Sequence, residues 1–564
     1  MKKRLLTLFV LLAAFCMAFP AFAEIISDET TGASCGSGLK WSYDTDTKTL
    51  TIDGTGKMSD FDEKFPGMIA PWRKVTKITK NLETINILDG VTSIGEHAFF
   101  CLDTLTSVAI PNSVKSINKC AFYGCSELAD LTIPEGVTEI GESAFEQCAA
   151  LTSVTVPGNV QHIGKSAFSS CDNLASVVVE DGVQSIGAYA FDWCGNLESI
   201  TLSDSVTSIG DQAFARTALY NEWYDNSELC SVLYIGNHLI KADEWAVNKG
   251  IAEGTTTSDY AVKPGTVTVA DAAFYGCDAL TSITLPDSVQ SIGSKAFASC
   301  YGLTSITIPK NVTNLGEGAF LTCTGLTEIR VDPDNTAYIS ENGVLYNKEK
   351  TEIVCYPKNK PDTSFALPEG VTSLAVGAFE RCRNLTSILL PDGVTNIGQE
   401  AFNTCDALTS IRLPDGVTTI GGYAFFGCDA LTSITLPNSV EIIGDYAFSG
   451  CGSPKKVYYN GSEVDWDEIL KGVSYSVTRD EITFCKGIRA VQTADGIVVS
   501  PANMENGMVI LALYDGKRLA ELQTAAYVGE DITFTSDVSY THAKVMVWDS
   551  LNSLSPVCAA KNVP

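Results

Sequence analysis

An Ala-Phe pair recurs along this chain at a fixed interval, and this repeat limits the possible folds more than any other feature. Within each of three blocks the interval is 23 residues, and two longer gaps, Phe214 to Phe274 and Phe320 to Phe379, separate the blocks. A fixed period of about 20 to 50 residues is typical of solenoids and repeat arrays. The repeated phenylalanines are Phe99, Phe122, Phe145, Phe168, Phe191, Phe214, Phe274, Phe297, Phe320, Phe379, Phe402, Phe425 and Phe448.

Apolar residues keep a constant offset from each repeated phenylalanine. Ile, Val or Leu lies five residues before it, as in Ile94 and Ile117, Leu lies six after it, and aliphatic residues follow at nine and eleven after it. The resulting L-x-x-I-x-L pattern has the two-residue alternation of a short strand, which a proline ends in most copies. Because a 23-residue unit cannot bury its own apolar side chains, identical neighbours must cover them. We therefore predict a parallel β-solenoid with 23-residue rungs and few or no long helices.

The full repeat, L-x-x-I-x-L-P-x-x-V-x-x-I-G-x-x-A-F-x-x-C, is clearest in residues 280–300. It resembles the BspA-like class of leucine-rich repeats over residues 85–454, which implies a leucine-rich-repeat solenoid. The two gaps equal two periods plus 14 or 13 residues, so we expect hairpin insertions near residues 219–263 and 332–362. Within them, residues 230–243 and 342–357 have the pattern of a strand, a tight turn and a strand, with Gly236-Asn237 turning the first.

Both ends of a repeat stack expose apolar surface, so the terminal segments should cap it. Residues 24–84 predict an N-terminal β cap with a hairpin over residues 39–54, and residues 455–487 predict a C-terminal capping segment; both resemble the ends of the same family. Beyond them, residues 488–564 predict a small β-sandwich, similar to fibronectin-type-III-like modules, with a hairpin turn at Asp515-Gly516. Trp548 and Tyr514 there fit either a core or a platform for a sugar.

The first 23 residues have the pattern of a cleaved secretory signal. Lys2, Lys3 and Arg4 precede an apolar run, and Ala21-Phe22-Ala23 matches an A-x-A cleavage site. We therefore expect a secreted or cell-surface protein without a membrane span, cleaved after Ala23. The net charge of −29 argues against nucleic acid as a partner, because such affinity depends on Lys and Arg displacing counterions.

Nineteen cysteines would suit a disulfide framework in an exported chain, but their spacing favours another interpretation. Residues in one phase of the repeat point the same way, whereas a disulfide needs two converging side chains. We predict a ladder of packed free thiols, and expect no zinc site because no C-x-x-C pair occurs. The ladder lies three residues after the phenylalanines, at Cys125, Cys148, Cys171, Cys194, Cys277, Cys300, Cys323, Cys382, Cys405, Cys428 and Cys451.

No constellation of residues with an enzymatic pattern occurs in this sequence. The motifs H-E-x-x-H, G-x-S-x-G and G-x-x-x-x-G-K-[ST] are missing, and the Asp332 to Gly343 segment lacks the glycine and glutamate of a calcium loop. We expect the four histidines, His97, His162, His238 and His542, on the surface or in rung corners. The expectation is a protein that is not an enzyme and has no cofactor and no metal.

The candidate binding surface is therefore the set of outward residues on each strand, eight and ten residues after the phenylalanine. Ser and Thr dominate it, which fits either a solvated sheet or a hydroxyl-lined concave trough that a ligand occupies. Asp130, Glu328, Arg330 and Arg412 depart from the pattern. The ligand-binding candidates are Asp130, Thr132, Ser282, Thr284, Ser305, Thr307, Glu328, Arg330, Ser410, Arg412, Ser433 and Thr435.

The family resemblance implies a non-enzymatic adhesion or interaction protein that binds extracellular proteins, such as host matrix proteins, or other cells. The alternative is a carbohydrate-binding protein that acts through the hydroxyl-lined face or the C-terminal module. The sequence carries no signal for an oligomeric state.

Overall fold

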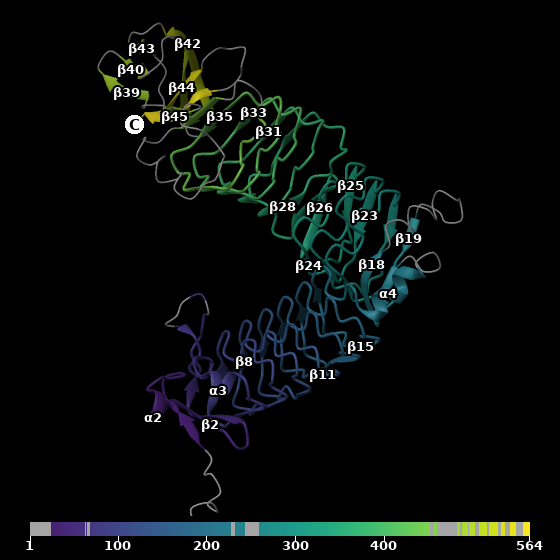
Figure 1. Cartoon of the computed structure of the whole chain (residues 1–564). Coiled ribbons are helices and arrows are strands. Elements are labelled where there is room, and N and C mark those ends of the chain that lie inside the picture. The colour runs from purple at the N-terminus through teal and green to yellow at the C-terminus, as the bar shows by residue number, and fades with distance from the viewer. Residues whose placement is uncertain are drawn as a thin grey trace, which may run out of the picture. The chain divides into compact units, whose positions relative to one another are not determined.

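The computed structural model describes residues 24–62, 64, 68–226, 232–242 and 259–451, together with the strands of residues 456–563. The expected signal peptide, residues 1–23, lies outside the described residues. The chain divides into two units, residues 1–241 with 267–271, and residues 242–266 with 272–564. Each unit is a stack of rungs, so the predicted parallel β-solenoid is confirmed (Figure 1). Among the described residues no helix is long and apolar enough to cross a membrane.

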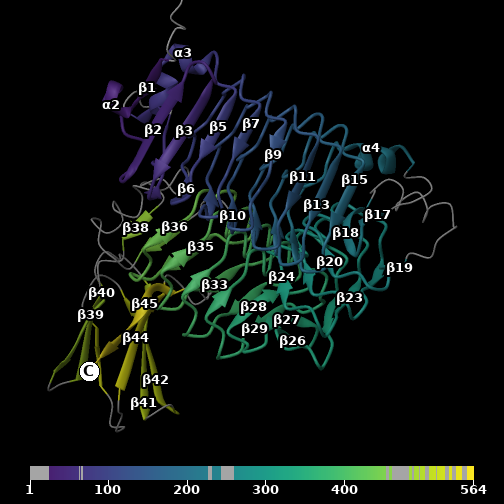
Figure 2. The ribbon, with the colours of Figure 1, turned by 90° about the horizontal axis from the view of Figure 1, so that it is seen from below.

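In unit 1, one face carries the strands that the L-x-x-I-x-L pattern predicted, and Figure 2 shows them side by side. They form two groups of three, and within each group a strand bonds in parallel to the one 23 residues away, for example Ser153 to Ser176 and Ser176 to Ser199. These strands are β5 (Thr84–Ile87), β7 (Ser107–Ala109), β9 (Asp130–Leu131), β11 (Ser153–Val156), β13 (Ser176–Val179) and β15 (Ser199–Leu202).

A second ladder of short strands runs through the -V-x-x-I-G- segment of each rung. Ile117, Ile140, Ile163 and Ile186 are consecutive partners in it, and all are at most 1% exposed. The next residue is usually glycine because successive backbones touch: a Cβ on Gly164 would lie 2.4 Å from the carbonyl carbon of Gly141. In unit 1 the ladder comprises β4 (Gly56–Lys57), β6 (Val91–Ile94), β8 (Ser116–Ile117), β10 (Glu139–Ile140), β12 (His162–Ile163), β14 (Ser185–Ile186) and β16 (Ser208–Ile209).

Unit 2 repeats both ladders. The long-face strands are β19 (Asp259–Ala261), β21 (Ser282–Thr284), β23 (Ser305–Ile308), β25 (Glu328–Val331), β29 (Ser364–Ala366), β31 (Ser387–Leu389), β33 (Ser410–Arg412), β35 (Ser433–Leu436), β37 (Lys456–Tyr459) and β38 (Ile482–Phe484). The short strands are β22 (Ser291–Ile292), β24 (Asn314–Leu315), β30 (Ser373–Leu374), β32 (Asn396–Ile397), β34 (Thr419–Ile420) and β36 (Ile442–Ile443).

The repeated phenylalanines form the core. Phe122, Phe145, Phe168 and Phe191 are fully buried and stack with ring centroids 5.2 to 5.4 Å apart. Trp72 begins the column, 5.2 Å from Phe99 and nearly parallel to it, and its indole donates to the carbonyl of Ala98 at 2.8 Å. The cap therefore supplies a buried aromatic ring that covers the first phenylalanine.

The residues around each phenylalanine, from two before it to three after it, form a tight turn that we name the Phe corner. In all thirteen Phe corners the residues two before and two after the phenylalanine have a positive φ, for example Tyr189 at 60° and Trp193 at 61°. Glycine tolerates this conformation best, yet it fills only six of these positions: Gly124, Gly276, Gly318, Gly377, Gly427 and Gly450.

The predicted thiol ladder is confirmed: the described cysteines are free, and ladder members such as Cys125 and Cys300 are completely buried. Each of nine ladder thiols donates to the carbonyl of the phenylalanine 26 residues earlier, as Cys125 does to Phe99 at 3.1 Å. Burial raises the pKa of the Cys125 thiol to about 12, so the group stays protonated and keeps its donor at neutral pH.

The N-terminal segment contains the predicted hairpin. Strands β2 (Leu39–Asp44) and β3 (Thr49–Gly54) pair antiparallel, and β3 then pairs in parallel with β5, so the hairpin begins the long ladder. Strand β1 (Ile25–Ser27) pairs with β2. Helices are short here: α2 (Asp28–Thr31), the 3-10 helix η2 (Pro71–Lys74) and α3 (Thr76–Thr79).

Two longer connections follow the rungs of Phe214 and Phe320. The first contains α4 (Ala218–Asp225), β17 (Val232–Ile235) and β18 (His238–Ala242), and β18 pairs in parallel with β20 (Thr268–Val269). Our expectation that the histidines lie on the surface or in rung corners is wrong for His238, which is fully buried in β18. The second contains β26 (Tyr338–Glu341), β27 (Val344–Asn347) and β28 (Glu352–Cys355), with β26 and β27 antiparallel.

The strands of residues 488–564 form two sheets of antiparallel strands. One contains β39 (Ile488–Thr493), β40 (Gly496–Pro501) and β43 (Ile532–Phe534); the other contains β41 (Gly507–Asp515), β42 (Arg518–Tyr527), β44 (His542–Trp548) and β45 (Pro556–Val563). Strands β41 and β42 flank the predicted Asp515-Gly516 turn. The two interpretations of Tyr514 and Trp548 concern side chains outside the described residues.

Candidate functional site

The twelve candidate ligand-binding residues lie on the long strands or immediately after them, and the ladder register aligns them in columns. Ser282 pairs with Ser305, which in turn pairs with Glu328; Thr307 pairs with Arg330. Their side chains alternate with buried ones, so β25 places Glu328 and Arg330 outward and Ile329 inward. Asp130 and Thr132 belong to unit 1 and the other ten to unit 2. We name the surface formed by the ten candidates of unit 2 the hydroxyl face.

Charged residues interrupt the hydroxyl face at two places in unit 2. Glu328 and Arg330 form an ion pair along β25, so their charges offset one another. Arg412 on β33 is exposed and lies between Leu389 and Thr435 in the ladder. Leu389 is itself 60% exposed, so Arg412 has an apolar neighbour on one side and a hydroxyl on the other. This part of the surface therefore combines charged, apolar and hydroxyl side chains on neighbouring strands.

The second long connection meets the hydroxyl face at β25. The amide of Ile329 donates to the carbonyl of Gly343 at 2.9 Å, and the hydroxyl of Ser340 donates to the carbonyl of Ile329. Gly343 has a φ of 79°, and a Cβ there would lie 3.0 Å from the Cβ of Glu328. The turn between β26 and β27 therefore packs directly beside Glu328, and no spacing rule in the sequence indicated this contact.

The same connection places an unexpected residue in the phenylalanine column. Tyr356 follows β28 and stacks on Phe379 with centroids 5.3 Å apart, and its amide donates to Ala378 as a repeated phenylalanine would. It lies 23 residues before Phe379, so the period itself could have revealed it if tyrosine had been allowed at the phenylalanine position.

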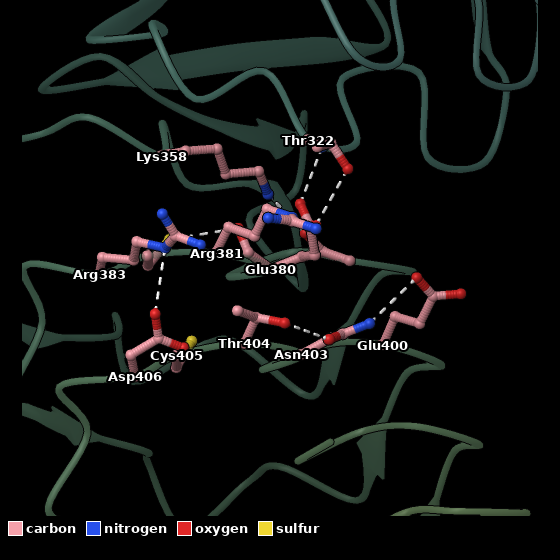
Figure 3. Close-up of polar contacts among 12 residues, drawn as sticks. Thr322, Lys358, Glu380, Arg381, Arg383, Glu400, Asn403, Thr404, Cys405 and Asp406 are labelled. Carbon is pink, nitrogen blue, oxygen red and sulfur yellow. Dashed lines mark hydrogen bonds and ion pairs between the residues drawn. The ribbon is translucent and has the colours of Figure 1, made fainter. Parts of the chain in front are cut away.

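A cluster of buried charged side chains lies in and beside the rung that contains Tyr356 (Figure 3). The carboxylate of Glu380, 3% exposed, accepts hydrogen bonds from the amide and hydroxyl of Thr322 at 2.8 and 3.1 Å and from Arg381 at 2.9 Å. Lys358, 4% exposed, donates to the carbonyl of Gly377 at 2.7 Å. Glu380 is the carboxylate that acts on Lys358 electrostatically. The cluster joins the rungs of Phe320 and Phe379 by side chains where the regular backbone ladder is interrupted.

A cavity of about 470 Å³ adjoins this cluster in unit 2. Its polar lining includes Glu317, Tyr338, Glu352 and Lys358. Burial raises the pKa of the Glu352 carboxyl, and the charge of Glu317 raises it further. Among the described residues, no group of three or more His, Cys, Asp or Glu side chains is placed to hold a metal ion. The buried thiols close by, such as Cys355, are protonated because burial raises their pKa, and a protonated thiol is a poor nucleophile.

Parallel rungs of 23 residues, a buried leucine, isoleucine and phenylalanine core and an exposed strand face together define a leucine-rich-repeat solenoid. The chain belongs to the BspA type leucine rich repeat family, whose description matches residues 77–194, 254–360 and 354–467. A search among curated proteins found no match.

Several solved bacterial structures are similar to this chain. A leucine rich cell surface protein of Faecalibacterium prausnitzii is 26% identical, with 78% of this chain and 97% of that chain covered and a TM-score of 0.34. A leucine-rich repeat protein of Bacteroides ovatus is 23% identical, with 83% and 100% covered and a TM-score of 0.29. The pneumococcal vaccine antigen PcpA is 18% identical, with 82% and 99% covered and a TM-score of 0.32.

Proposed function

We propose that this protein is a non-enzymatic, extracellular interaction protein that binds macromolecular ligands, either host matrix proteins or other cells, through its hydroxyl face. The observation that carries the proposal is the set of outward, at least partly exposed Ser and Thr side chains that are aligned in register on two sheets of unit 2, with the Glu328–Arg330 pair in one sheet and Arg412 in the other. Extended strand faces of solenoids offer many weak contacts to one large partner.

The location outside the cell belongs to the same proposal. It is supported by the signal-like residues 1–23 and by a similar structure that is described as a cell surface protein. The fibronectin-type-III-like resemblance of residues 488–564 fits an exported, modular chain.

The test is binding of the purified chain to immobilised collagen, fibronectin, laminin and whole bacterial cells. Arg412→Ala should weaken binding at least about fivefold, because an exposed arginine between an apolar and a hydroxyl neighbour is a typical interface residue. Arg383→Ala is the matched control: it removes the same charge, but from an ion pair with Asp406 at 3.2 Å, and both residues lie in the turns that precede the long strands rather than on the strands. Equal effects of both substitutions, or no binding by the folded chain, would contradict the proposal.

A further inference from the structure

The Phe corner of the rung at Phe191 differs from the others because aromatic residues occupy both of its left-handed positions. Tyr189 has a φ of 60° and Trp193 a φ of 61°. Across the thirteen Phe corners, Trp193 is the only aromatic residue two positions after the phenylalanine, where four rungs have glycine and the rest have small, polar or charged residues. A bulky side chain in the left-handed region is unfavourable and uncommon.

Folding compensates for this choice only in part. The side chain of Trp193 is 56% exposed, so more than half of its surface stays in contact with water. Glycine occupies the same position in other corners, such as those of Gly124 and Gly276. Residues with a strained backbone cluster at functional sites, where the strain can hold a side chain in a required direction.

The indole ring is also held in place. The guanidinium of Arg216 lies over it, 4.8 Å from the ring centroid. Arg216 is itself fixed by two hydrogen bonds to the buried carboxylate of Asp192, at 2.9 and 3.1 Å, and by a third to the Oε1 of Gln212 at 3.2 Å. One ring face is thus covered by a rigid planar cation, and the exposed area belongs to the ring edge and the opposite face.

Further polar groups extend along the same corner from Arg216, through its hydrogen bond to Gln212. The Nε2 of Gln212 lies 3.4 Å from the hydroxyl of Tyr189, and the ammonium of Lys165 lies 6.0 Å from the Tyr189 ring centroid. The corner therefore offers one exposed aromatic surface together with an amide and a phenol, which can both donate and accept hydrogen bonds, and an ammonium, which can only donate.

We propose that this corner is a carbohydrate site, in which the apolar face of a neutral sugar ring stacks on Trp193 and its hydroxyls bond to Gln212 and Tyr189. A flat ring with an apolar face and a polar rim matches a lone aromatic surface bordered by hydrogen-bonding groups. The groups next to Trp193, namely Arg216 and through it Gln212, are polar, which favours a ligand rich in hydroxyl groups. The net charge of −29 disfavours acidic glycans. This site lies on a Phe corner and not on the hydroxyl face, and its ligand is a neutral sugar, whereas the hydroxyl face is proposed to bind matrix proteins or cells.

The experiment is saturation-transfer NMR on the full chain with neutral trisaccharides of glucose, mannose, galactose and N-acetylglucosamine. At least one should show transfer to its ring protons, and Trp193→Gly should reduce its affinity at least about tenfold. Trp193→Gly should also raise the melting temperature, because glycine relieves the left-handed strain. A gain in stability with a loss of binding separates a binding role from a structural one.

Two comparisons complete the test. Ser170→Gly changes the equivalent position of the preceding rung, where φ is 58°, and should leave sugar binding unchanged. Arg216→Lys keeps the charge but loses the paired hydrogen bonds to Asp192, and should weaken binding several-fold. The proposal is overturned if no neutral sugar binds, if binding survives Trp193→Gly, or if Trp193 proves necessary only for a protein partner.

Discussion

The thiol of Cys148 donates a hydrogen bond to the carbonyl of Phe122, which lies 26 residues earlier in the chain and one rung away, at 3.3 Å. Both residues are completely buried. The amide of Phe122 is occupied as well, donating to Ala144 at 2.8 Å. The ladder cysteine thus serves as a donor to the buried phenylalanine carbonyl in addition to being a small apolar side chain.

Cys148→Ala should therefore destabilise the solenoid by about 1–3 kcal/mol, because it removes a donor from a buried carbonyl and leaves a small cavity. The midpoint of urea unfolding, followed by circular dichroism, measures the change. Cys101→Ala provides the control, since Cys101 is exposed and should cost less than about 0.5 kcal/mol. Equal losses for the two substitutions would contradict the hydrogen-bonding role.

The left-handed Phe corners predict that glycine substitutions there stabilise the protein. Ser299 has a φ of 60°, and Gly276 occupies the equivalent position of the preceding rung with a φ of 77°. Ser299→Gly should raise the free energy of unfolding by up to about 1 kcal/mol, because a non-glycine residue is strained in this region. Gly276→Ala should lower it by a similar amount. Thermal melting of the two variants measures both signs, and a destabilised Ser299→Gly would refute the argument.

The repeat predicted most of this fold because every rung repeats the same burial. Offsets such as Ile five residues before the phenylalanine identified core positions directly, and Ile140 and Ile163 are buried in register as expected. The thiol ladder followed from the same reasoning. The positive φ angles of the Phe corners were harder to predict, because glycine occupies only a minority of the equivalent positions. Polar residues occupy many of the others and tolerate the same backbone conformation.

The candidate site was less predictable, since the departures from the repeat depend on contacts that no period encodes. The outward positions of the hydroxyl face came from strand alternation alone. The packing of Gly343 against Glu328 and the buried position of Lys358 depend on the path of the second long connection, and the repeat does not encode this path. Lysine is seldom fully buried, so its placement could not be expected from its residue type.

The buried histidine of the first long connection predicts a dependence of stability on pH. His238 donates from Nε2 to the carbonyl of Ser203 at 3.1 Å, and its Nδ1 is buried without a hydrogen-bond partner among the described residues. Burial lowers the pKa of His238, although the Ser203 carbonyl and the charge of Asp204 act in the opposite direction. The folded chain therefore favours the neutral imidazole.

Because the folded pKa lies below the unfolded value of about 6.5, this group costs no stability above that pH. Below it the unfolded state gains a proton first, so stability falls as the pH decreases toward the folded pKa. Urea midpoints at pH 7.5 and 5.5 should differ more for the wild type than for His238→Gln, which has no titrating group. The exposed His162 supplies the control, since His162→Gln should keep the wild-type slope.

The buried charged cluster around Glu380 predicts that Glu380 and Lys358 contribute to the free energy of unfolding in a coupled way. Glu380→Gln removes a negative charge that acts electrostatically on the buried Lys358 ammonium, and it weakens the bonds from Thr322 and Arg381. We expect a loss of about 2–4 kcal/mol, because an uncompensated buried charge is costly. Adding Lys358→Met to Glu380→Gln should recover a large part of this loss, since an apolar side chain of similar length then fills the site. Urea unfolding of the two single variants and the double variant gives the coupling energy, and strictly additive losses would show that the two charges act independently.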